Sequence, residues 1–198
     1  MWYRTGGIEL GHRWGVRALL ATVMVALLAG CGQSGTNEAG YISGDGRTQE
    51  IPVADRGEPV ELTGETLEGK PFDLADTRGK VTVLNVWWTG CAPCRKEMPM
   101  LQAAYEELGD TVAFVGLNTR DASAAQGLAF ERHYGVEYPS VYSPDGAAVL
   151  ALKGSLAPRA IPATAILDAE GRVAALIRGE IPSARTLDEL ISSAGEQA

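Results

Sequence analysis

Cysteine and histidine are scarce in this sequence: the chain of 198 residues has three cysteines and two histidines. So few cysteines exclude a small fold that several disulfides hold together, so the core must depend on buried apolar side chains. With 45% hydrophobic residues, the chain has apolar material for one domain of ordinary size. Cys31, Cys91 and Cys94 therefore each need an explanation of their own.

Basic residues are outnumbered, with 17 Lys and Arg against 25 Asp and Glu and a formal net charge of -8. Proteins that bind nucleic acid carry clustered Lys and Arg on a basic domain, which this composition does not provide. We therefore expect no nucleic-acid partner. An acidic surface mainly keeps a protein soluble and says little about its partners.

A long apolar run is also missing near the N-terminus, where the unbroken apolar or small stretch is Ala18–Ala29. As a helix this stretch would rise only about 18 Å, against about 30 Å for the hydrocarbon core of a bilayer. Arg4, Arg13 and Arg17 precede it, and this order of charge and apolar residues is typical of a secretory signal peptide. We predict a signal peptide over residues 1–30.

The apolar stretch ends in Leu28-Ala29-Gly30-Cys31, which resembles a bacterial lipobox. The resemblance implies that Cys31 is lipid-modified and that the protein is anchored on the extracytoplasmic face of a bacterial cell membrane. The alternative is an uncleaved short anchor with an incidental cysteine. Residues 31–57 are rich in Gly, Ser, Thr, Asn and acidic residues, and we interpret them as a flexible linker.

Residues 58–198 are expected to form the folded domain, because turn residues and apolar runs alternate there. The apolar runs Val81–Trp88 and Val112–Leu117 predict buried strands, and Ala92–Leu108 between them predicts a helix with one apolar face. The order strand, helix, strand implies a parallel crossover.

Further elements are predicted from turn and capping residues, and together they favour a mixed sheet with helices on both faces. They are a hairpin of Val60–Leu62 and Phe72–Leu74, a helix from Asp121 or Ser123 to Tyr134 that stops at Gly135, a helix over Ala147–Leu152, a hairpin of Ala163–Leu167 and Val173–Ile177, and a helix over Thr186–Ser193.

Cys91 and Cys94 lie where a predicted strand passes into a predicted helix. Thiolate is the attacking species in disulfide exchange, and the N-terminus of a helix stabilises negative charge. We therefore predict that Cys91 is the nucleophile and that Cys94, one turn further, resolves the mixed disulfide. Pro93 is tolerated between them because its missing N–H would have no partner in the first turn.

Other roles for this pair fit less well. A zinc site needs two further ligands, and the other candidates are His12, in the predicted signal peptide, and the single His133. A purely structural disulfide stays open, although so short a loop constrains the unfolded chain little. We expect no metal and no cofactor.

The segment Val83–Pro99 closely resembles the active-site region of TlpA/ResA-like proteins, which are membrane-tethered thiol-disulfide oxidoreductases. The resemblance extends roughly from Glu58 to the C-terminus. It implies an α/β, thioredoxin-like fold: a mixed central sheet flanked by helices, with an N-terminal β-hairpin and a central helical insertion. The matching residues of the segment are Trp87, Cys91, Pro93, Cys94, Glu97 and Pro99.

The resemblance also implies a function. It suggests an extracytoplasmic reductant of disulfides in client proteins, often apocytochrome c during cytochrome c maturation, which a membrane electron donor of the CcdA or DsbD type recharges. We expect the protein to be a monomer. Glu97 stands where ResA-like members carry an acid near the sulfurs, so we hypothesise that it moves protons to or from Cys94. The alternative is a solvated helix carboxylate.

Two residues depart from the family pattern, and a third differs from thioredoxins proper. Gly90 stands where the family commonly has Trp, and Trp88 stands where a small residue is usual. Asn85 replaces the buried acid of thioredoxins proper, which shifts that proton-transfer role toward Glu97. Because of Gly90 and Trp88, we expect substrate selection near Cys91 to differ from that of the family, with Trp88 supplying apolar surface.

The segment Ile161-Pro162-Ala163-Thr164 resembles the cis-proline element of this family. A cis bond before Pro162 would expose the backbone of Ile161 for strand-like pairing with a substrate; the alternative is a trans proline that starts an edge strand. We expect Trp88, Pro93, Ile161 and Pro162 to contact an extended polypeptide.

Rival functions use the same fold. A peroxiredoxin needs a peroxidatic cysteine in a different setting. A Sco-like copper-binding module has three residues between its cysteines, instead of the two found here, plus a distant histidine. A dithiol oxidant that assists disulfide formation would use the same residues as a reductant, so the sequence leaves the direction of electron flow open.

Overall fold

The structure, a computed structural model, describes residues 43–152 and 160–196. The predicted signal peptide, Cys31 and the first part of the predicted linker lie outside these ranges. Within the described ranges, no helix is both long and apolar enough to span a membrane.

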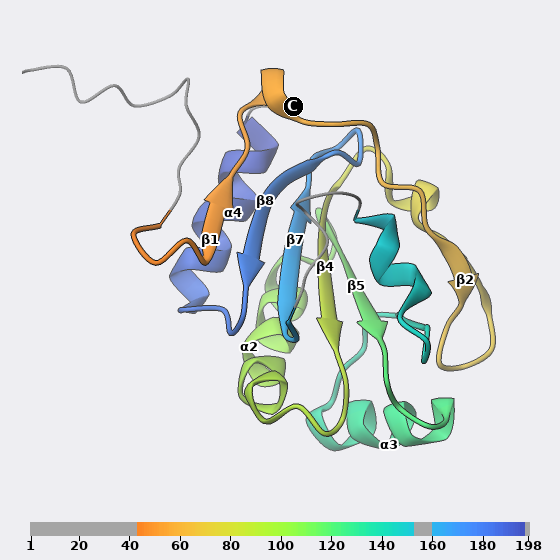
Figure 1. Cartoon of the computed structure of the whole chain (residues 1–198). Helices are drawn as coiled ribbons and strands as arrows, with labels where there is room; N and C mark the ends of the chain where they lie inside the picture. The colour runs from red at the N-terminus through yellow and green to blue at the C-terminus, as the bar shows by residue number, and fades with distance from the viewer. Residues whose placement is uncertain (1–42, 153–159, 197–198) are drawn as a thin grey trace, which may run out of the picture. The chain divides into compact units, whose positions relative to one another are not determined.

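A mixed sheet lies at the centre of the domain, with the strand order β1-β8-β7-β4-β5-β6 (Figure 1). The pairs β4–β5 and β5–β6 are parallel, whereas β4–β7, β7–β8 and β1–β8 are antiparallel. The predicted mixed sheet and parallel crossover are therefore confirmed. The strands are β1 (Thr48–Glu50), β4 (Val81–Trp87), β5 (Val112–Asn118), β6 (Ser140–Tyr142), β7 (Ala163–Leu167) and β8 (Val173–Arg178).

Different elements cover the two faces of the sheet. In Figure 1, α2 (Ala92–Leu108) and α4 (Ala184–Glu196) lie behind the sheet, and the short teal helix η3 (Ala147–Ala151) lies in front of it. The helix α3 (Ala124–Tyr134) contacts α2 at the lower end of this view. The predicted helix at 147–152 is thus a 3-10 helix.

The central strand β4 is buried on both faces of the sheet. Its side chains point alternately to the two faces, so Val83 and Trp87 join the core cluster behind the sheet, while Leu84 and Val86 join the cluster in front. Because both faces are covered, the two polar residues of the strand, Thr82 and Asn85, are buried as well, and their side chains form hydrogen bonds with other side chains.

The helix boundaries follow local capping chemistry. Ser123 caps α3, because its Oγ accepts a hydrogen bond from Gln126 N at 3.4 Å, and Gly135 ends the helix in the left-handed conformation with φ 68°. Both residues were predicted for these roles. Pro99 lies inside α2, as the resemblance implied.

The boundary between linker and domain was predicted wrongly. Within the range assigned to the linker, β1 pairs with β8, and the 3-10 helix η1 (Val53–Asp55) follows it. The side chain of Arg56 is 1% exposed and forms an ion pair with Asp168 at 3.0 Å. The folded domain therefore begins before Glu58, because a short polar strand is stabilised by a distant partner strand that composition does not reveal.

The N-terminal hairpin is present but shifted. Its strands are β2 (Thr63–Glu65) and β3 (Pro71–Asp73), followed by the 3-10 helix η2 (Leu74–Thr77). The apolar residues that suggested the strands, including Val60, Leu62 and Leu74, are instead buried in the core cluster in front of the sheet.

Candidate active site

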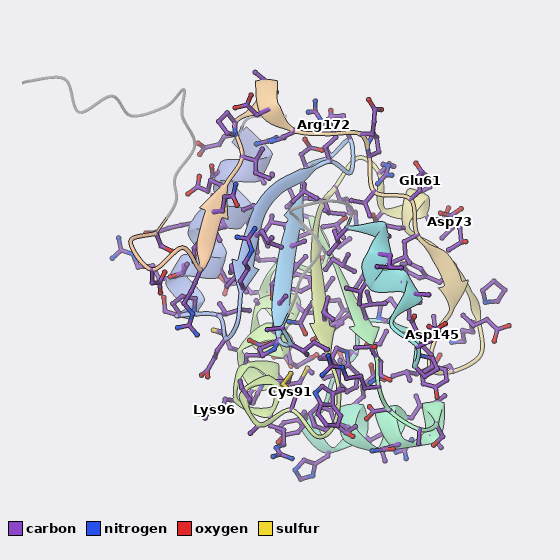
Figure 2. All side chains as sticks on the ribbon, in the orientation of Figure 1. Glu61, Asp73, Cys91, Lys96, Asp145 and Arg172 are labelled. Atoms are coloured by element: carbon purple, nitrogen blue, oxygen red, sulfur yellow. A yellow bond between two sulfur atoms is a disulfide. The ribbon has the colours of Figure 1, made fainter. Side chains whose placement is uncertain are left out.

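Cys91 and Cys94 form a disulfide where β4 leads into α2. Figure 2 shows Cys91 at the lower end of the sheet, beside the start of α2, with its sulfur in yellow. Their Cα atoms are 5.3 Å apart. Cys91 is 5% exposed and Cys94 is 0% exposed, so Cys91 is the sulfur that an incoming group can reach. This difference supports the predicted division into nucleophile and resolving cysteine.

The backbone around the disulfide favours a thiolate at Cys91. This residue is the N-cap of α2, and its Sγ accepts a hydrogen bond from Cys94 N at 3.1 Å. The first N–H groups of a helix have no partner within the helix, and they carry the positive end of its dipole. An anionic sulfur at Cys91 would therefore be stabilised by hydrogen bonding and by charge.

Glu97 lies on the buried side of α2, one turn beyond Cys94. Its side chain is 2% exposed; Oε1 accepts a hydrogen bond from Asn85 Nδ2 at 3.0 Å and Oε2 accepts one from Ile181 N at 3.2 Å. Burial raises the pKa of Glu97 to about 7, although these two hydrogen bonds oppose the shift. The alternative of a solvated helix carboxylate is therefore wrong.

Asn85 connects the two halves of the site. Its Nδ2 donates to Glu97 Oε1 and also to Thr164 Oγ1, each at 3.0 Å. Thr164 is the second residue of β7, so one neutral side chain on β4 orients the carboxyl group and joins it to the strand that follows Pro162. An acid at this position would place a second charge beside Glu97.

The peptide bond between Ile161 and Pro162 is cis, as the resemblance implied. Pro162 is buried and its carbonyl accepts a hydrogen bond from Gly179 N at 2.9 Å. The pairing between β4 and β7 ends at Val86 and Ala163. The cis bond comes just before Ala163 and the segment that leads to Cys91 comes just after Val86, so both lie at the same end of the sheet. Trp88, Pro93 and Ile161 are half-buried near that edge.

Asp121 is a residue of the site that sequence reasoning considered only as a helix cap. It is 1% exposed, and its carboxylate accepts hydrogen bonds from Thr89 Oγ1 at 2.6 Å, Thr89 N at 3.2 Å and Asn118 Nδ2 at 2.7 Å. Asp121 thus holds the loop between Trp88 and Cys91. Its place just after β5 was a usable signal, because the carboxyl ends of the parallel strands β4 and β5 meet at one edge.

The backbone before Asp121 is held in an uncommon conformation. Arg120 has a positive φ of 63°, which is unfavourable for a residue with a Cβ and costs about 1–3 kcal/mol. Its N–H donates to Pro144 O at 3.2 Å, and Tyr142 Oη donates to Asp121 O at 3.0 Å. These contacts with the end of β6 and the segment that follows it hold Asp121 in place.

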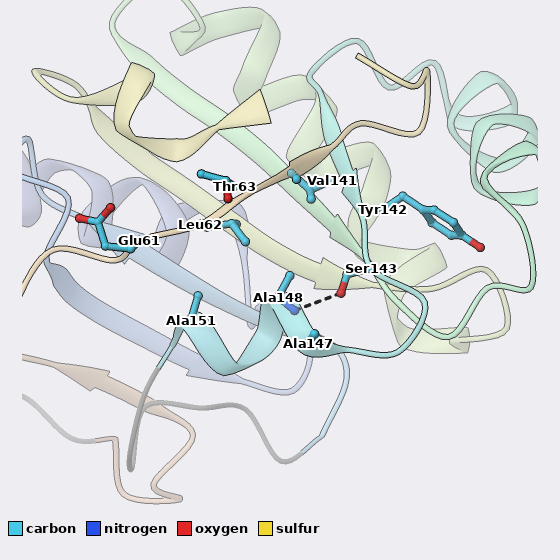
Figure 3. Close-up of a pocket in the computed structure, with 10 residues that line it drawn as sticks. Glu61, Leu62, Thr63, Val141, Tyr142, Ser143, Ala147, Ala148 and Ala151 are labelled. Carbon is cyan, nitrogen blue, oxygen red and sulfur yellow. Dashed lines mark hydrogen bonds between the residues drawn. The ribbon is translucent and has the colours of Figure 1, made fainter. Parts of the chain in front are cut away.

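A cleft on the opposite face of the sheet is separate from this site. It lies between β2, β6 and η3 (Figure 3), and a hydrogen bond from Ala148 N to Ser143 Oγ at 3.0 Å closes one side. Neither Cys91 nor Cys94 lines it. In residues 43–152 and 160–196, no group of three or more His, Cys, Asp or Glu side chains is placed to hold a metal ion.

Three features define a thiol-disulfide oxidoreductase of thioredoxin-like fold. They are a disulfide at the N-terminus of a helix, a buried acid one turn further along that helix, and a cis proline at the same end of the sheet. A family model described as Redoxin matches residues 50–191. The chain therefore belongs to the Redoxin family, and within it is a thiol-disulfide oxidoreductase of the ResA/DsbE type.

Relatives and solved structures agree with this assignment. The chain is 30% identical to the thiol-disulfide oxidoreductase ResA of Bacillus thuringiensis subsp. konkukian over 164 residues, which is 82% of this chain and 88% of that protein. A DsbF homologue from Corynebacterium diphtheriae is similar with a TM-score of 0.67 and 33% identity over 79% of this chain and 99% of its own. A secreted thiol-disulfide isomerase from Corynebacterium glutamicum has a TM-score of 0.69 and 32% identity, with the same coverage of 79% and 99%.

Proposed function

We propose that the protein is an extracytoplasmic reductant of disulfides in client proteins, attached to the bacterial cell membrane by lipid on Cys31. The observation that carries the proposed direction is the setting of Cys94, which is fully buried beside the buried, weakly acidic Glu97. The relative from Corynebacterium glutamicum is described as secreted, which supports a place outside the cytoplasm.

The reaction follows from the order in which the sulfurs can be reached. The Cys91 thiolate attacks a client disulfide, forms a mixed disulfide and releases one client cysteine as thiolate. Glu97 takes the proton of Cys94, and the Cys94 thiolate attacks the Cys91 sulfur and releases the second client cysteine. The client gains two electrons and the protein is left with the Cys91–Cys94 disulfide. A membrane dithiol donor of the CcdA or DsbD type returns the two electrons.

The surroundings of Cys94 favour this direction over the oxidant alternative. A strong dithiol oxidant has a stabilised reduced form, which requires a favourable setting for thiolate. Here a thiolate at Cys94 would be fully buried beside a carboxyl group. The nearest basic residues in sequence, Arg95 and Lys96, are exposed on the outer side of α2, and Lys96 pairs with Glu180 at 3.8 Å. A Cys94 thiolate is therefore disfavoured, which supports the reductant direction, whereas the helix N-terminus at Cys91 acts in the opposite sense. The reduction potential measures the balance of the two effects.

The client surface is proposed to be the edge that carries Trp88, Pro93, Ile161 and Pro162. An extended client segment would pair with the backbone of Ile161 and place its cysteine against Cys91. The resemblance to ResA-like proteins makes apocytochrome c a client to test first, and we propose that the protein acts as a monomer.

Measurement of the reduction potential of the Cys91–Cys94 pair tests the direction. We expect a value below about -250 mV, in the range of thioredoxin, whereas a value near the roughly -120 mV of DsbA would establish the oxidant alternative. A Cys94→Ala variant should accumulate mixed disulfides with clients, and Cys91→Ala should accumulate none.

Mass spectrometry of the mature N-terminus tests the anchor, since an unmodified Cys31 contradicts it.

A further inference from the structure

We infer that Trp88 and Gly90 act as one unit that selects clients with an apolar side chain next to the reacting cysteine. This inference rests on the proposed function and adds a substrate preference to it. The structure shows that the Trp88 ring occupies the space beside Gly90.

Space, and not backbone conformation, requires glycine at position 90. The glycines with positive φ in the described ranges do not include Gly90, so its backbone would accept another residue. A Cβ at this position, however, would lie within 2.9 Å of three carbons of the Trp88 indole, Cε3, Cζ3 and Cη2. Real Cβ contacts are almost never that short. The Trp88 ring therefore occupies the volume that a side chain on residue 90 would need.

The turn from Trp88 to Cys91 is held by hydrogen bonds and packing. Trp88 packs against the core cluster that contains Cys91 and Cys94, and its carbonyl accepts a hydrogen bond from Cys91 N at 3.2 Å. The intervening Thr89 is fixed by Asp121 through Oγ1 at 2.6 Å. Both ends of this turn are thus anchored, so the backbone cannot shift easily and a side chain at Gly90 would have to displace the indole ring itself.

Trp88 and Ile161 lie at the same end of the sheet. The pairing between β4 and β7 ends at Val86 and Ala163. Trp88 follows Val86 by two residues, Ile161 precedes Ala163 by two, and both are half-buried. Ile161 packs against the same core cluster as Trp88. A client cysteine that reaches Cys91 therefore brings its neighbouring side chain against an indole and an aliphatic side chain, which favour an apolar group.

The test compares two disulfide-linked peptides that differ only in Leu or Ser next to the cysteine, with oxidised glutathione as a small reference substrate. We expect the unchanged protein to favour the Leu peptide in kcat/KM by about tenfold, the scale on which apolar contacts discriminate. Trp88→Ala should remove most of that preference. A preserved preference in Trp88→Ala would overturn the inference. Leu150→Ala, at a 69% exposed apolar residue on η3 across the sheet, should leave the preference unchanged.

Exchange of the two residues tests their coupling. Gly90→Trp alone should lower the melting temperature and the rate with both peptides, because two aromatic rings cannot share the site. The double variant Trp88→Ser with Gly90→Trp should recover the melting temperature and the Leu preference. If Gly90→Trp alone is as stable as the double variant, the coupling is refuted. A protein that reduces neither peptide nor oxidised glutathione refutes the proposed function, whereas one that reduces all three without preference refutes only this inference.

Discussion

Glu97 and Asp168 are both buried carboxyl groups, at 2% and 1% exposure, but they lie at opposite ends of the sheet and have different partners. Asp168 follows β7 and forms ion pairs with Arg56 at 3.0 Å and Arg172 at 2.8 Å. Glu97 accepts its hydrogen bonds from the Asn85 amide and a backbone N–H. Figure 2 shows Arg172 at the upper end of the sheet and Cys91 at the lower end.

The comparison shows that the partner decides what a buried carboxyl group can do. Burial by itself would raise the pKa of Asp168, but hydrogen bonds and charge from Arg172 and Arg56 outweigh it, so the pKa lies below its usual value. Burial dominates at Glu97, and its pKa rises to about 7. Asp168 therefore stays charged and holds the N-terminal segment, whereas Glu97 can gain and lose a proton near neutral pH.

The largest effect is expected at Asp168. Asp168→Ala removes the carboxylate that faces two guanidinium groups, one of them 1% exposed, and the free energy of unfolding should fall by about 3–5 kcal/mol. Urea unfolding measures this change. Glu189→Ala, which removes the partner of the exposed Arg185 at 2.7 Å, serves as the control and should change stability little. A similarly small loss in Asp168→Ala would mean that this ion pair does not hold the domain.

The pH dependence of stability should separate Glu97 from Asp168. The folded protein keeps the Glu97 proton up to about pH 7, whereas the unfolded chain loses it near 4.5. Stability from this group is therefore complete below the unfolded pKa and declines as pH rises through the window to about 7, by an amount on the order of 3 kcal/mol. Glu97→Gln should flatten that decline. Asp168, with its lowered pKa, stabilises the fold above its unfolded pKa of 3.8 and loses that contribution at more acid pH.

Catalysis should depend on Glu97 but not on Glu131, another buried acid. Glu97→Gln should slow resolution of the mixed disulfide by about 100-fold at pH 7, because Cys94 loses its proton acceptor, as stopped-flow kinetics can measure. Glu131 is the matched control: burial raises its pKa to about 7 as well, but it lies on α3, where its hydrogen bond is to Ser140. Glu131→Gln should flatten part of the stability profile and leave the resolution rate unchanged. Equal rates in both variants would remove Glu97 from the mechanism.

Asp121 should give the smallest change in stability. Asp121→Ala deprives Thr89 and Asn118 of their acceptor, and the expected loss is about 1–2 kcal/mol. The local effect should be clearer, since the Thr89 amide, which now donates to Asp121 at 3.2 Å, should exchange with solvent faster. An unchanged exchange rate would show that the loop before Cys91 is held by other contacts.

Sequence reasoning succeeded where the signal was local. The helix α2, its first-turn proline and the pair Cys91 and Cys94 follow from residues within two turns of each other. Likewise, the cap Ser123 and the stop Gly135 were predicted because capping chemistry involves only neighbouring residues. The family resemblance added the cis bond at Pro162, which no local pattern requires.

The errors and omissions concern contacts between distant segments. The strand β1 is polar and short, and its pairing with β8 joins residues more than a hundred positions apart. For the same reason Arg56 was placed in a linker and Asp121 was considered only as a cap. The burial of Glu97 was also undecided, because a helix pattern does not show that Asn85 and Ile181 close over its carboxyl group.

The sequence by itself determined that two sulfurs meet on the first turn of a helix, because the spacing of Cys91 and Cys94 is a property of one helical turn. Only the tertiary structure decided how that pair is equipped: which carboxyl group can exchange a proton near pH 7, what holds Thr89, and which ring fills the space beside Gly90. Each of these depends on which groups exclude water and fill space around the site, and packing between remote segments sets both.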